Sequence, residues 1–160
     1  MKLCVVGTGY VGLVAGTCFA ESGNDVACVD VLEEKVTRLN NGEIPIYEPG
    51  LEELVKRNSA EGRLTFTTDL TAAVKSAEVC IIAVGTPMDH SGAADLSAVM
   101  AVAASIAKAA DGPKVVAIKS TVPLYRTYED EIKALREWAS SRARRASTDS
   151  RLNELWKASN

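Results

Sequence analysis

A glycine-rich turn near the start of the chain limits the possible folds more than any other feature. It follows directly on the short apolar run Leu3–Val6 and reads Gly7-Thr8-Gly9-Tyr10-Val11-Gly12. An apolar run that ends at a glycine is typical of a buried parallel strand. The small residues after the turn predict a helix from about Tyr10 to Ser22, which Gly23 ends. The pattern therefore predicts a strand, a tight turn and a helix, the opening unit of a doubly wound α/β sheet.

Each glycine of the turn has a role if this unit binds a dinucleotide. Gly7 permits the tight turn, Gly9 lets the backbone approach a pyrophosphate, and Gly12 lets the helix pack close to the strand. The pyrophosphate would then lie at the helix N-terminus, where free N–H groups point outward. Because glycine is common in turns, the glycines alone are a weak signal, and their context of strand and helix strengthens it.

An acidic residue at the end of the next strand completes the pattern. Asp25–Val29 is expected to form that strand, and Asp30 follows it. The Asp30 carboxylate would accept hydrogen bonds from the adenosine ribose and repel a 2′-phosphate, and the neighbouring Val31 offers no cation. NAD is therefore favoured over NADP as the cofactor. Lys35 is the nearby cation, and it is either a cofactor contact or a solvated helix residue.

The order of the further elements predicts a parallel sheet. Beyond Asp30 the expected strands are Leu64–Thr67, Val79–Val84 and Val115–Ile118. The expected helices are Leu32–Asn40, Leu51–Arg57, a short helix through Val74 that Thr68 or Asp69 caps, and Asp95 to about Ala110. Strands that alternate with helices predict a Rossmann-type, doubly wound parallel sheet of about five to six strands, covered on both faces.

Two loops follow the fourth and fifth expected strands. They are Gly85-Thr86-Pro87 and Ser120-Thr121. Ligands of open α/β sheets bind at the carboxyl ends of the strands, where both loops would lie. Each loop is therefore a candidate ligand contact, with ordinary loop chemistry as the alternative.

Composition excludes several classes of protein. The net charge is −3 at pH 7, so no overall basic field favours nucleic acid or anionic lipid. No apolar run is long enough to span a membrane and the N-terminus lacks a signal-peptide pattern, so a cytoplasmic location is expected. The four cysteines are expected to be buried, reduced thiols, and no ligand cluster predicts a metal site. The cysteines are Cys4, Cys18, Cys28 and Cys80.

Longer motifs carry a resemblance to a known family. The glycine turn, Asp30 and Lys35 belong to this resemblance. Three longer motifs add to it: Pro45-Ile46-Tyr47-Glu48-Pro49-Gly50-Leu51, Val84-Gly85-Thr86-Pro87 and Lys119-Ser120-Thr121-Val122-Pro123. With these motifs, residues 1–123 resemble the NAD-binding domain of the UDP-glucose/GDP-mannose dehydrogenase family, most closely bacterial UDP-glucose 6-dehydrogenases. The Tyr47–Gly50 loop and the Gly85–Pro87 turn are more specific than the glycine turn.

The resemblance implies an activity and a set of site residues. The activity is the NAD-dependent oxidation of UDP-glucose to UDP-glucuronate with formation of two NADH, within nucleotide-sugar metabolism and polysaccharide biosynthesis. It also implies that Thr121 helps to position a water near the reacting centre. The expected cofactor-binding residues are Gly7, Gly9, Tyr10, Val11, Gly12, Asp30, Lys35, Gly85, Thr86, Pro87 and Thr121.

The resemblance ends after Pro123. Residues 124–160 are highly charged and predict a helical tail that departs from the family pattern. Its apolar residues either cover the edge of the sheet or pair with a second copy of the chain in a homodimer. The family's catalytic cysteine belongs to a later domain, and none of the cysteines here is expected to replace it. We therefore expect the chain to bind NAD without completing the reaction, and a UDP-sugar to bind only when the missing domain is supplied.

Three classes of function follow from these patterns. The chain is a truncated cofactor domain of a dehydrogenase, a free-standing NAD-binding module or sensor, or a structural or engineered Rossmann fragment. A titration with NADH separates the third class from the first two, because only a fragment without a cofactor site would show no saturable binding.

Overall fold

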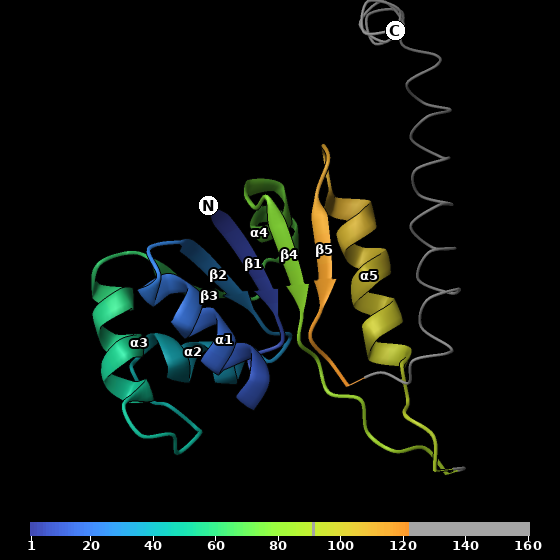
Figure 1. Cartoon of the computed structure of the whole chain (residues 1–160), viewed down its shortest axis with the longest axis horizontal. Helices are drawn as coiled ribbons and strands as arrows, with labels where there is room; N and C mark the ends of the chain where they lie inside the picture. Colours follow the sequence, from blue (N-terminus) through green and yellow to red (C-terminus); the bar gives the residue numbers. More distant parts are fainter. Residues whose placement is uncertain (91, 122–160) are drawn as a thin grey trace, which may run out of the picture. The chain divides into compact units, whose positions relative to one another are not determined.

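One parallel sheet organises the part of the chain that the structure describes. The computed structural model describes residues 1–90 and 92–121. Within them five strands lie in the order β3-β2-β1-β4-β5, and every neighbouring pair is parallel (Figure 1). The strands are β1 Lys2–Val6, β2 Asp25–Val29, β3 Leu64–Thr67, β4 Val79–Ile82 and β5 Val115–Ile118. The helices are α1 Tyr10–Glu21, α2 Glu33–Asn40, α3 Leu51–Ala60, α4 Leu70–Ser76 and α5 Ser97–Ala109.

The strand order is that of a Rossmann fold, as the sequence predicts. The first three strands run outward to one side of β1, and the chain then returns to place β4 on its other side. The reversal between β1 and β4 is the switch point at which open α/β sheets bind their ligands. The helical tail that was predicted over residues 124–160 lies outside the described residues.

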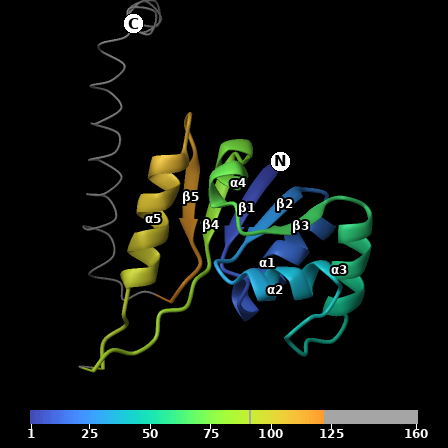
Figure 2. The ribbon, with the colours of Figure 1, turned by 180° about the vertical axis from the view of Figure 1, so that it is seen from behind.

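Helices cover both faces of this sheet. Core side chains of α1, α2 and α3 pack with alternate residues of the strands, among them Val5, Cys28 and Phe66. The other alternate residues face α4 and α5, which contact the sheet at β1, β2 and β4. Figure 1 views the sheet from the side of α1, and Figure 2 views it from the side of α4. Because both faces are covered, the central strands are almost entirely apolar.

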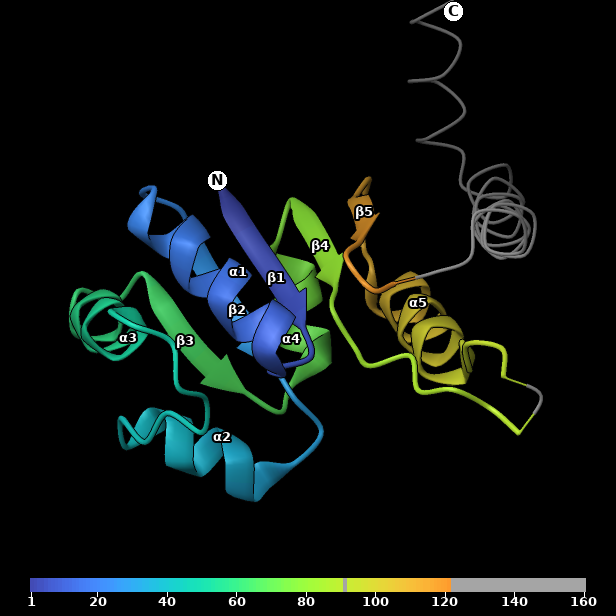
Figure 3. The ribbon, with the colours of Figure 1, turned by 60° about the horizontal axis from the view of Figure 1, so that its bottom comes forward.

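The edge of the sheet at β3 is also covered. The side chain of Asn40, the last residue of α2, donates a hydrogen bond of 3.2 Å to the Phe66 backbone oxygen. Figure 3 shows α2 and α3 lying beside β3. At the opposite edge, β5 alternates between exposed and half-buried residues. Within the described residues, β5 is the last strand of the sheet and pairs with β4 on one side.

Element boundaries agree closely with the sequence, and the ends of β4 and α3 are among those that differ. The strands β2, β3 and β5 have the predicted bounds. β4 ends at Ile82 rather than Val84, because the chain turns away toward the loop after β5. α3 continues to Ala60 rather than Arg57, and Asn58 in this added part is buried, with its side chain donating to the Leu54 carbonyl. The predicted cap of α4 is confirmed, because Asp69 accepts from the Ala72 N–H at 2.9 Å.

One cysteine differs from the expectation of four buried thiols. Cys4, Cys28 and Cys80 are buried, but Cys18 is exposed. The expectation for Cys18 was wrong because its position on α1 falls on the solvent side. Helical spacing places it in line with the exposed Val11, whereas Leu13 and Ala20 face the sheet.

No helix among the described residues combines the length and apolar character that a membrane crossing requires. Among the described residues, no group of three or more His, Cys, Asp or Glu side chains could hold a metal ion.

Candidate functional site

The glycine turn lies at the carboxyl edge of the sheet, between β2 and β4. The Gly7 N–H donates to the Val29 carbonyl at 2.7 Å, and Gly7 has a positive φ of 100°. A Cβ at Gly7 would lie 2.8 Å from the Ala83 carbonyl oxygen. A side chain is therefore excluded twice, by the backbone conformation and by the backbone of the strand beside it. This close approach brings the turn to the switch point of the sheet.

The start of α1 is open to an anion. Gly9 is the N-cap residue, and no acidic residue stands in the first turn of the helix. The side chains of Tyr10 and Val11 are 55% and 41% exposed, so they do not cover this end. The first N–H groups of a helix have no partner within it and carry partial positive charge. This end of α1 can therefore bind a phosphate group.

The other two glycines of the turn differ in what surrounds them. A Cβ at Gly12 would lie 1.8 Å from the Gly7 carbonyl oxygen, so the turn and the helix can meet only without it. A Cβ at Gly9 would have no atom of the described residues within 4 Å. The fold therefore requires Gly12, whereas Gly9 keeps open the space before the helix.

Asp30 lies beside this turn, at the end of β2, with its side chain 9% exposed. Its Oδ2 accepts from the Thr8 N–H at 3.0 Å and from the Thr8 hydroxyl at 2.6 Å. Its Oδ1 accepts from the Leu32 N–H at 3.2 Å. Burial alone would raise the pKa of Asp30, but the hydrogen bonds from Thr8, Lys35 and Leu32 outweigh it and lower the pKa to about 2. Asp30 is therefore a carboxylate at any physiological pH.

Lys35 is bound to this carboxylate rather than free in solvent. Its ammonium lies 2.9 Å from Asp30 Oδ2, and its side chain is 28% exposed. Lys35 is thus an ion-pair partner of Asp30 rather than a fully solvated helix residue, and its contact with the cofactor stays a prediction.

The loops after β4 and β5 are joined to each other. The Ser120 hydroxyl donates to the Val84 carbonyl at 2.6 Å, and the Thr86 hydroxyl donates to the Thr121 carbonyl at 3.0 Å. Gly85, Pro87 and Thr121 are exposed, and Thr86 is half-buried. The two candidate loops therefore form one wall at the carboxyl edge, as their positions in the sequence predict.

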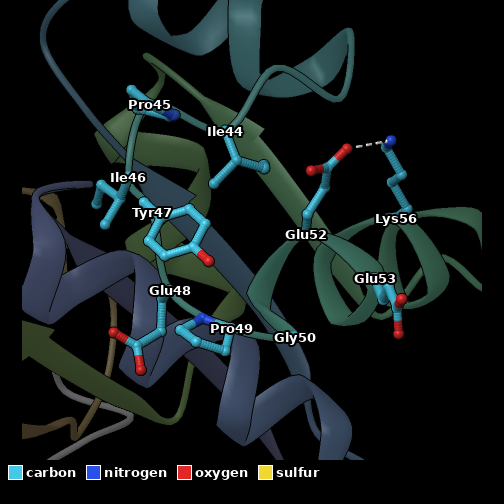
Figure 4. A pocket seen from close by; sticks show the side chains of 10 residues that line it. All are labelled: Ile44, Pro45, Ile46, Tyr47, Glu48, Pro49, Gly50, Glu52, Glu53 and Lys56. Atoms are coloured by element: carbon cyan, nitrogen blue, oxygen red, sulfur yellow. Dashed lines mark hydrogen bonds and ion pairs between the residues drawn. The ribbon is translucent and has the colours of Figure 1, made fainter.

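A contact that the sequence did not predict connects the glycine turn to the loop before α3. The Tyr10 hydroxyl donates to Glu48 Oε2 at 2.7 Å. This bond to an ionised carboxylate raises the pKa of Tyr10 above its usual value. Figure 4 shows Glu48 in the loop, beside an open pocket of about 810 Å³ between the loop and α3. The lining residues are Ile44, Pro45, Ile46, Tyr47, Glu48, Pro49, Gly50, Glu52, Glu53 and Lys56.

Three further residues belong to this edge although sequence reasoning gave them no individual role. They are Thr8, Glu48 and Ser120. Each lies inside a motif that the sequence does single out, so its place at this edge was predictable. Its hydrogen-bond partner was not predictable, because each bond joins segments far apart in the chain.

The fold and the site together define an NAD-binding Rossmann domain. The open N-terminus of α1, the glycine turn and the buried carboxylate lie at the edge where such domains bind the cofactor. The sequence model of the UDP-glucose/GDP-mannose dehydrogenase family, NAD binding domain, matches residues 1–152. The chain belongs to this family, and NAD is its cofactor. The match extends beyond Pro123, where the resemblance was expected to end.

The chain is similar in sequence to individual UDP-glucose 6-dehydrogenases. UDP-glucose 6-dehydrogenase TuaD of Bacillus subtilis is 54% identical over 123 residues, which are 77% of this chain and 27% of that protein. UDP-glucose 6-dehydrogenase of Rhizobium meliloti is 54% identical over 125 residues, which are 78% of this chain and 29% of that protein. The chain thus spans 27% to 29% of the length of these relatives.

Solved structures of the family have the same fold. A ternary complex of GDP-mannose dehydrogenase from Pseudomonas aeruginosa gives a TM-score of 0.82 at 34% identity, covering 88% of this chain and 33% of that chain. A UDP-glucose dehydrogenase from Pyrobaculum islandicum gives a TM-score of 0.78 at 39% identity, covering 86% of this chain and 32% of that chain.

Proposed function

We propose that this chain supplies the NAD-binding half of a nucleotide-sugar dehydrogenase that oxidises UDP-glucose. One observation carries the proposal: the open N-terminus of α1 and the buried Asp30 carboxylate lie side by side on the glycine turn. In this proposal the N–H groups at Tyr10 and Val11 bind the pyrophosphate. Asp30 accepts hydrogen bonds from the adenosine ribose, with Lys35 beside it.

The wall formed by the loops after β4 and β5 receives the other half of the cofactor. Thr86 and Thr121 are joined by a hydrogen bond of 3.0 Å, so they would act together there. Gly85 and Pro87 shape the turn, and Thr121 is the residue proposed to position a water near the reacting centre. The bound cofactor supplies the acceptor for hydride, and these residues orient it.

The complete reaction needs more than this chain offers. Oxidation of a primary alcohol to a carboxylate reduces two NAD, consumes one water and releases three protons. In the family, a thiol that belongs to a later domain holds the aldehyde between the two steps. Of the thiols here, Cys18 alone is exposed, and it lies on α1 about 12 Å from Tyr10 at 1.5 Å per residue. We therefore propose that the chain binds NAD but does not turn over UDP-glucose alone.

Partners, domain limits and location complete the proposal. A UDP-sugar would bind only when the remaining part of the enzyme is supplied, and a homodimer is the proposed assembly. Residues 1–123 would form the cofactor unit and residues 124–160 a separate segment. The cytoplasm is the proposed location, since nucleotide sugars and NAD are both found there.

The test is a titration of the purified chain with NADH and a separate turnover assay. Saturable binding of NADH is expected, together with no formation of NADH from UDP-glucose and NAD at 340 nm. Absence of saturable binding at millimolar cofactor would contradict the proposed site. Steady NADH formation would contradict the claim that the chain is inactive alone.

A further inference from the structure

One hydrogen bond joins the first residue of α1 to the loop that precedes α3. The Tyr10 hydroxyl donates to Glu48 Oε2 at 2.7 Å, across 38 positions of the sequence. We infer that Glu48 is a positioning residue of the cofactor site, which holds the Tyr10 ring away from the N-terminus of α1 and so keeps the place of the pyrophosphate open. This inference rests on the proposed function, because it assumes that the pyrophosphate binds at that helix end.

Tyr10 is the side chain at this helix end that needs to be held. It is the largest residue of the glycine turn, and it directly follows Gly9. The space at Gly9 is open, because no atom of the described residues lies within 4 Å of its ideal Cβ. The Tyr10 side chain is 55% exposed, so packing alone does not fix its ring. A side chain has several staggered rotamers, and the bond to Glu48 selects one of them.

The backbone of Glu48 is held by a tight turn. The Leu51 N–H donates to the Glu48 carbonyl at 3.1 Å, with Pro49 and Gly50 between them. Gly50 has φ of 80° and ψ of −11°. Proline followed by a glycine of positive φ is the sequence of a type II turn. Since Leu51 is 3% exposed and anchors the turn in the core, the carboxylate of Glu48 has a rigid support.

The residues before Glu48 fix which way its side chain points. Ile44, Ile46 and Glu48 are half-buried, whereas Pro45 and Tyr47 between them are exposed. Ile44 and Ile46 pack against the hydrophobic core. Figure 4 shows this loop, in which Tyr47 is 93% exposed. The isoleucines and the turn therefore attach the loop to the fold, and the Glu48 carboxylate remains available for Tyr10.

Charge argues that Glu48 acts through Tyr10 and not on the cofactor itself. A carboxylate and a pyrophosphate are both anions, so direct proximity would weaken binding. The phenol hydroxyl can donate to a carboxylate or to the carbonyl oxygen of an amide. Glutamine at position 48 would therefore keep the bond to Tyr10 and lose the charge. This substitution separates the positioning of Tyr10 from the electrostatic effect of Glu48.

The experiment titrates the chain calorimetrically with NADH. The wild-type chain is compared with Glu48→Ala, Glu48→Gln, Tyr10→Phe, Tyr10→Ala and the double variant Glu48→Ala/Tyr10→Ala. Urea unfolding establishes that each variant is folded. All of them keep the N–H groups at the start of α1. If Glu48→Ala does not fold, Tyr10→Phe carries the same prediction, because its ring has no hydroxyl to donate.

The inference predicts that a loose ring is worse for binding than no ring. Glu48→Ala and Tyr10→Phe should each weaken NADH binding by about threefold, because one of three staggered positions then leaves the helix end open. Tyr10→Ala should bind within about 1.5-fold of wild type, since no ring has to be held aside. Adding Glu48→Ala to Tyr10→Ala should then weaken binding no further. Glu48→Gln should also stay within about 1.5-fold of wild type.

The phenol of Tyr10 provides a second readout. Its bond to the Glu48 carboxylate raises the pKa of Tyr10 above its usual value. The difference in tyrosinate absorbance between the wild-type chain and Tyr10→Phe isolates the titration of this one phenol. Glu48→Gln should lower the pKa of Tyr10 toward the ordinary value of about 10, because the amide carries no charge. A role of Glu48 in loop stability alone would not move this titration.

The contrary outcomes are distinct. If the wild-type chain binds NADH but Tyr10→Ala binds it more weakly than Tyr10→Phe, the ring contacts the cofactor, and this inference is overturned while the proposed function stands. If Glu48→Ala weakens binding equally with and without the Tyr10 ring, Glu48 acts independently of Tyr10 and the inference is also overturned. If the wild-type chain does not bind NADH, the proposed function and the inference fail together.

Discussion

At the scale of single residues, the glycines of the turn are required for different reasons. Gly12 has the Gly7 carbonyl oxygen where a Cβ would be, so protein atoms exclude a side chain there. Gly9 has a φ of −69°, which any residue adopts, and no atom of the described residues lies within 4 Å of its ideal Cβ. Nothing among the described residues explains glycine at position 9, whereas a ligand bound before α1 would explain the space that it leaves.

Two alanine substitutions separate these roles. Gly12→Ala should lower the free energy of unfolding by about 2 kcal/mol or more, because the turn and α1 must move apart. Gly9→Ala should leave it within about 0.5 kcal/mol of wild type while weakening NADH binding. Urea unfolding and a cofactor titration measure the two effects. Loss of stability in Gly9→Ala, or unchanged NADH affinity, would show that this glycine serves the fold instead.

Asp30 predicts a specific loss of stability in acid. The pKa falls from an ordinary 3.8 to about 2 in the folded chain, although burial opposes the shift, because Thr8 and Lys35 hold the charged form. As the pH falls, the Asp30 carboxylate therefore binds a proton at a higher pH in the unfolded chain than in the folded chain. The contribution of Asp30 is complete above about pH 4 and is lost between pH 4 and 2, and it amounts to about 2 kcal/mol.

The matched variant is Asp30→Asn, whose amide does not titrate. The difference in unfolding free energy between wild type and Asp30→Asn should shrink as the pH is lowered from 5 to 2.5. Urea unfolding at several pH values measures it, and the other carboxylates cancel because both proteins contain them. A difference that stays constant over this range would mean that the folded and unfolded carboxyls titrate alike.

At the scale of elements, a buried amide ties α3 to its neighbours. Asn58 is 0% exposed, and its amide donates to Glu21 Oε2 and to the Leu54 carbonyl, both at 2.8 Å. Its Oδ1 accepts from Arg63 Nε at 3.0 Å. One side chain thus joins the end of α1, the last turns of α3 and the start of β3. α3 is the helix that follows the Tyr47–Gly50 loop, so this network supports the loop beside the glycine turn.

Asn58→Ala should therefore destabilise the fold. The expected loss is about 1–3 kcal/mol in the free energy of unfolding, because Arg63 and Glu21 lose a buried partner. Ser59→Ala is the matched control on the same helix, since Ser59 is exposed, and a change within about 0.5 kcal/mol is expected for it. Equal effects of the two substitutions in urea unfolding would contradict a role for the network.

Elements were predictable where local pattern and tertiary environment agree. β2, β3 and β5 have the predicted bounds because glycine, aspartate or proline stands close to their ends and interrupts the apolar run. The last turn of α3 was not predictable, because a polar Asn58 on its inner side breaks the apolar pattern and is buried only through partners on other elements.

At the scale of the whole molecule, the cofactor site should be coupled to stability. The glycine turn, α1 and β2 meet at the site, and all belong to one sheet with its helices. A ligand that binds the folded chain alone stabilises it by about 2.7 kcal/mol when present at 100 times its Kd. We expect NADH to raise the Tm of the chain by roughly 5–10 °C at that level.

Differential scanning fluorimetry with increasing NADH measures this shift. Gly9→Ala at the same cofactor concentration is the control, because its fold should be intact and its binding weakened. A Tm that does not depend on NADH in the wild-type chain would contradict a site built into the fold.

The sequence alone determined the fold class, the cofactor and the family. Glycines, an acidic strand end and the periodicity of apolar residues act over short stretches of chain, so they can be read directly. Tertiary structure alone decided that Thr8 and Lys35 hold Asp30, that Tyr10 meets Glu48, and that Cys18 faces solvent. The glycine turn thus does more than join β1 to α1, because its threonine also donates two hydrogen bonds to the Asp30 carboxylate. The physical reason is that hydrogen-bond partners and burial depend on which segments the sheet brings together, and no local pattern specifies that.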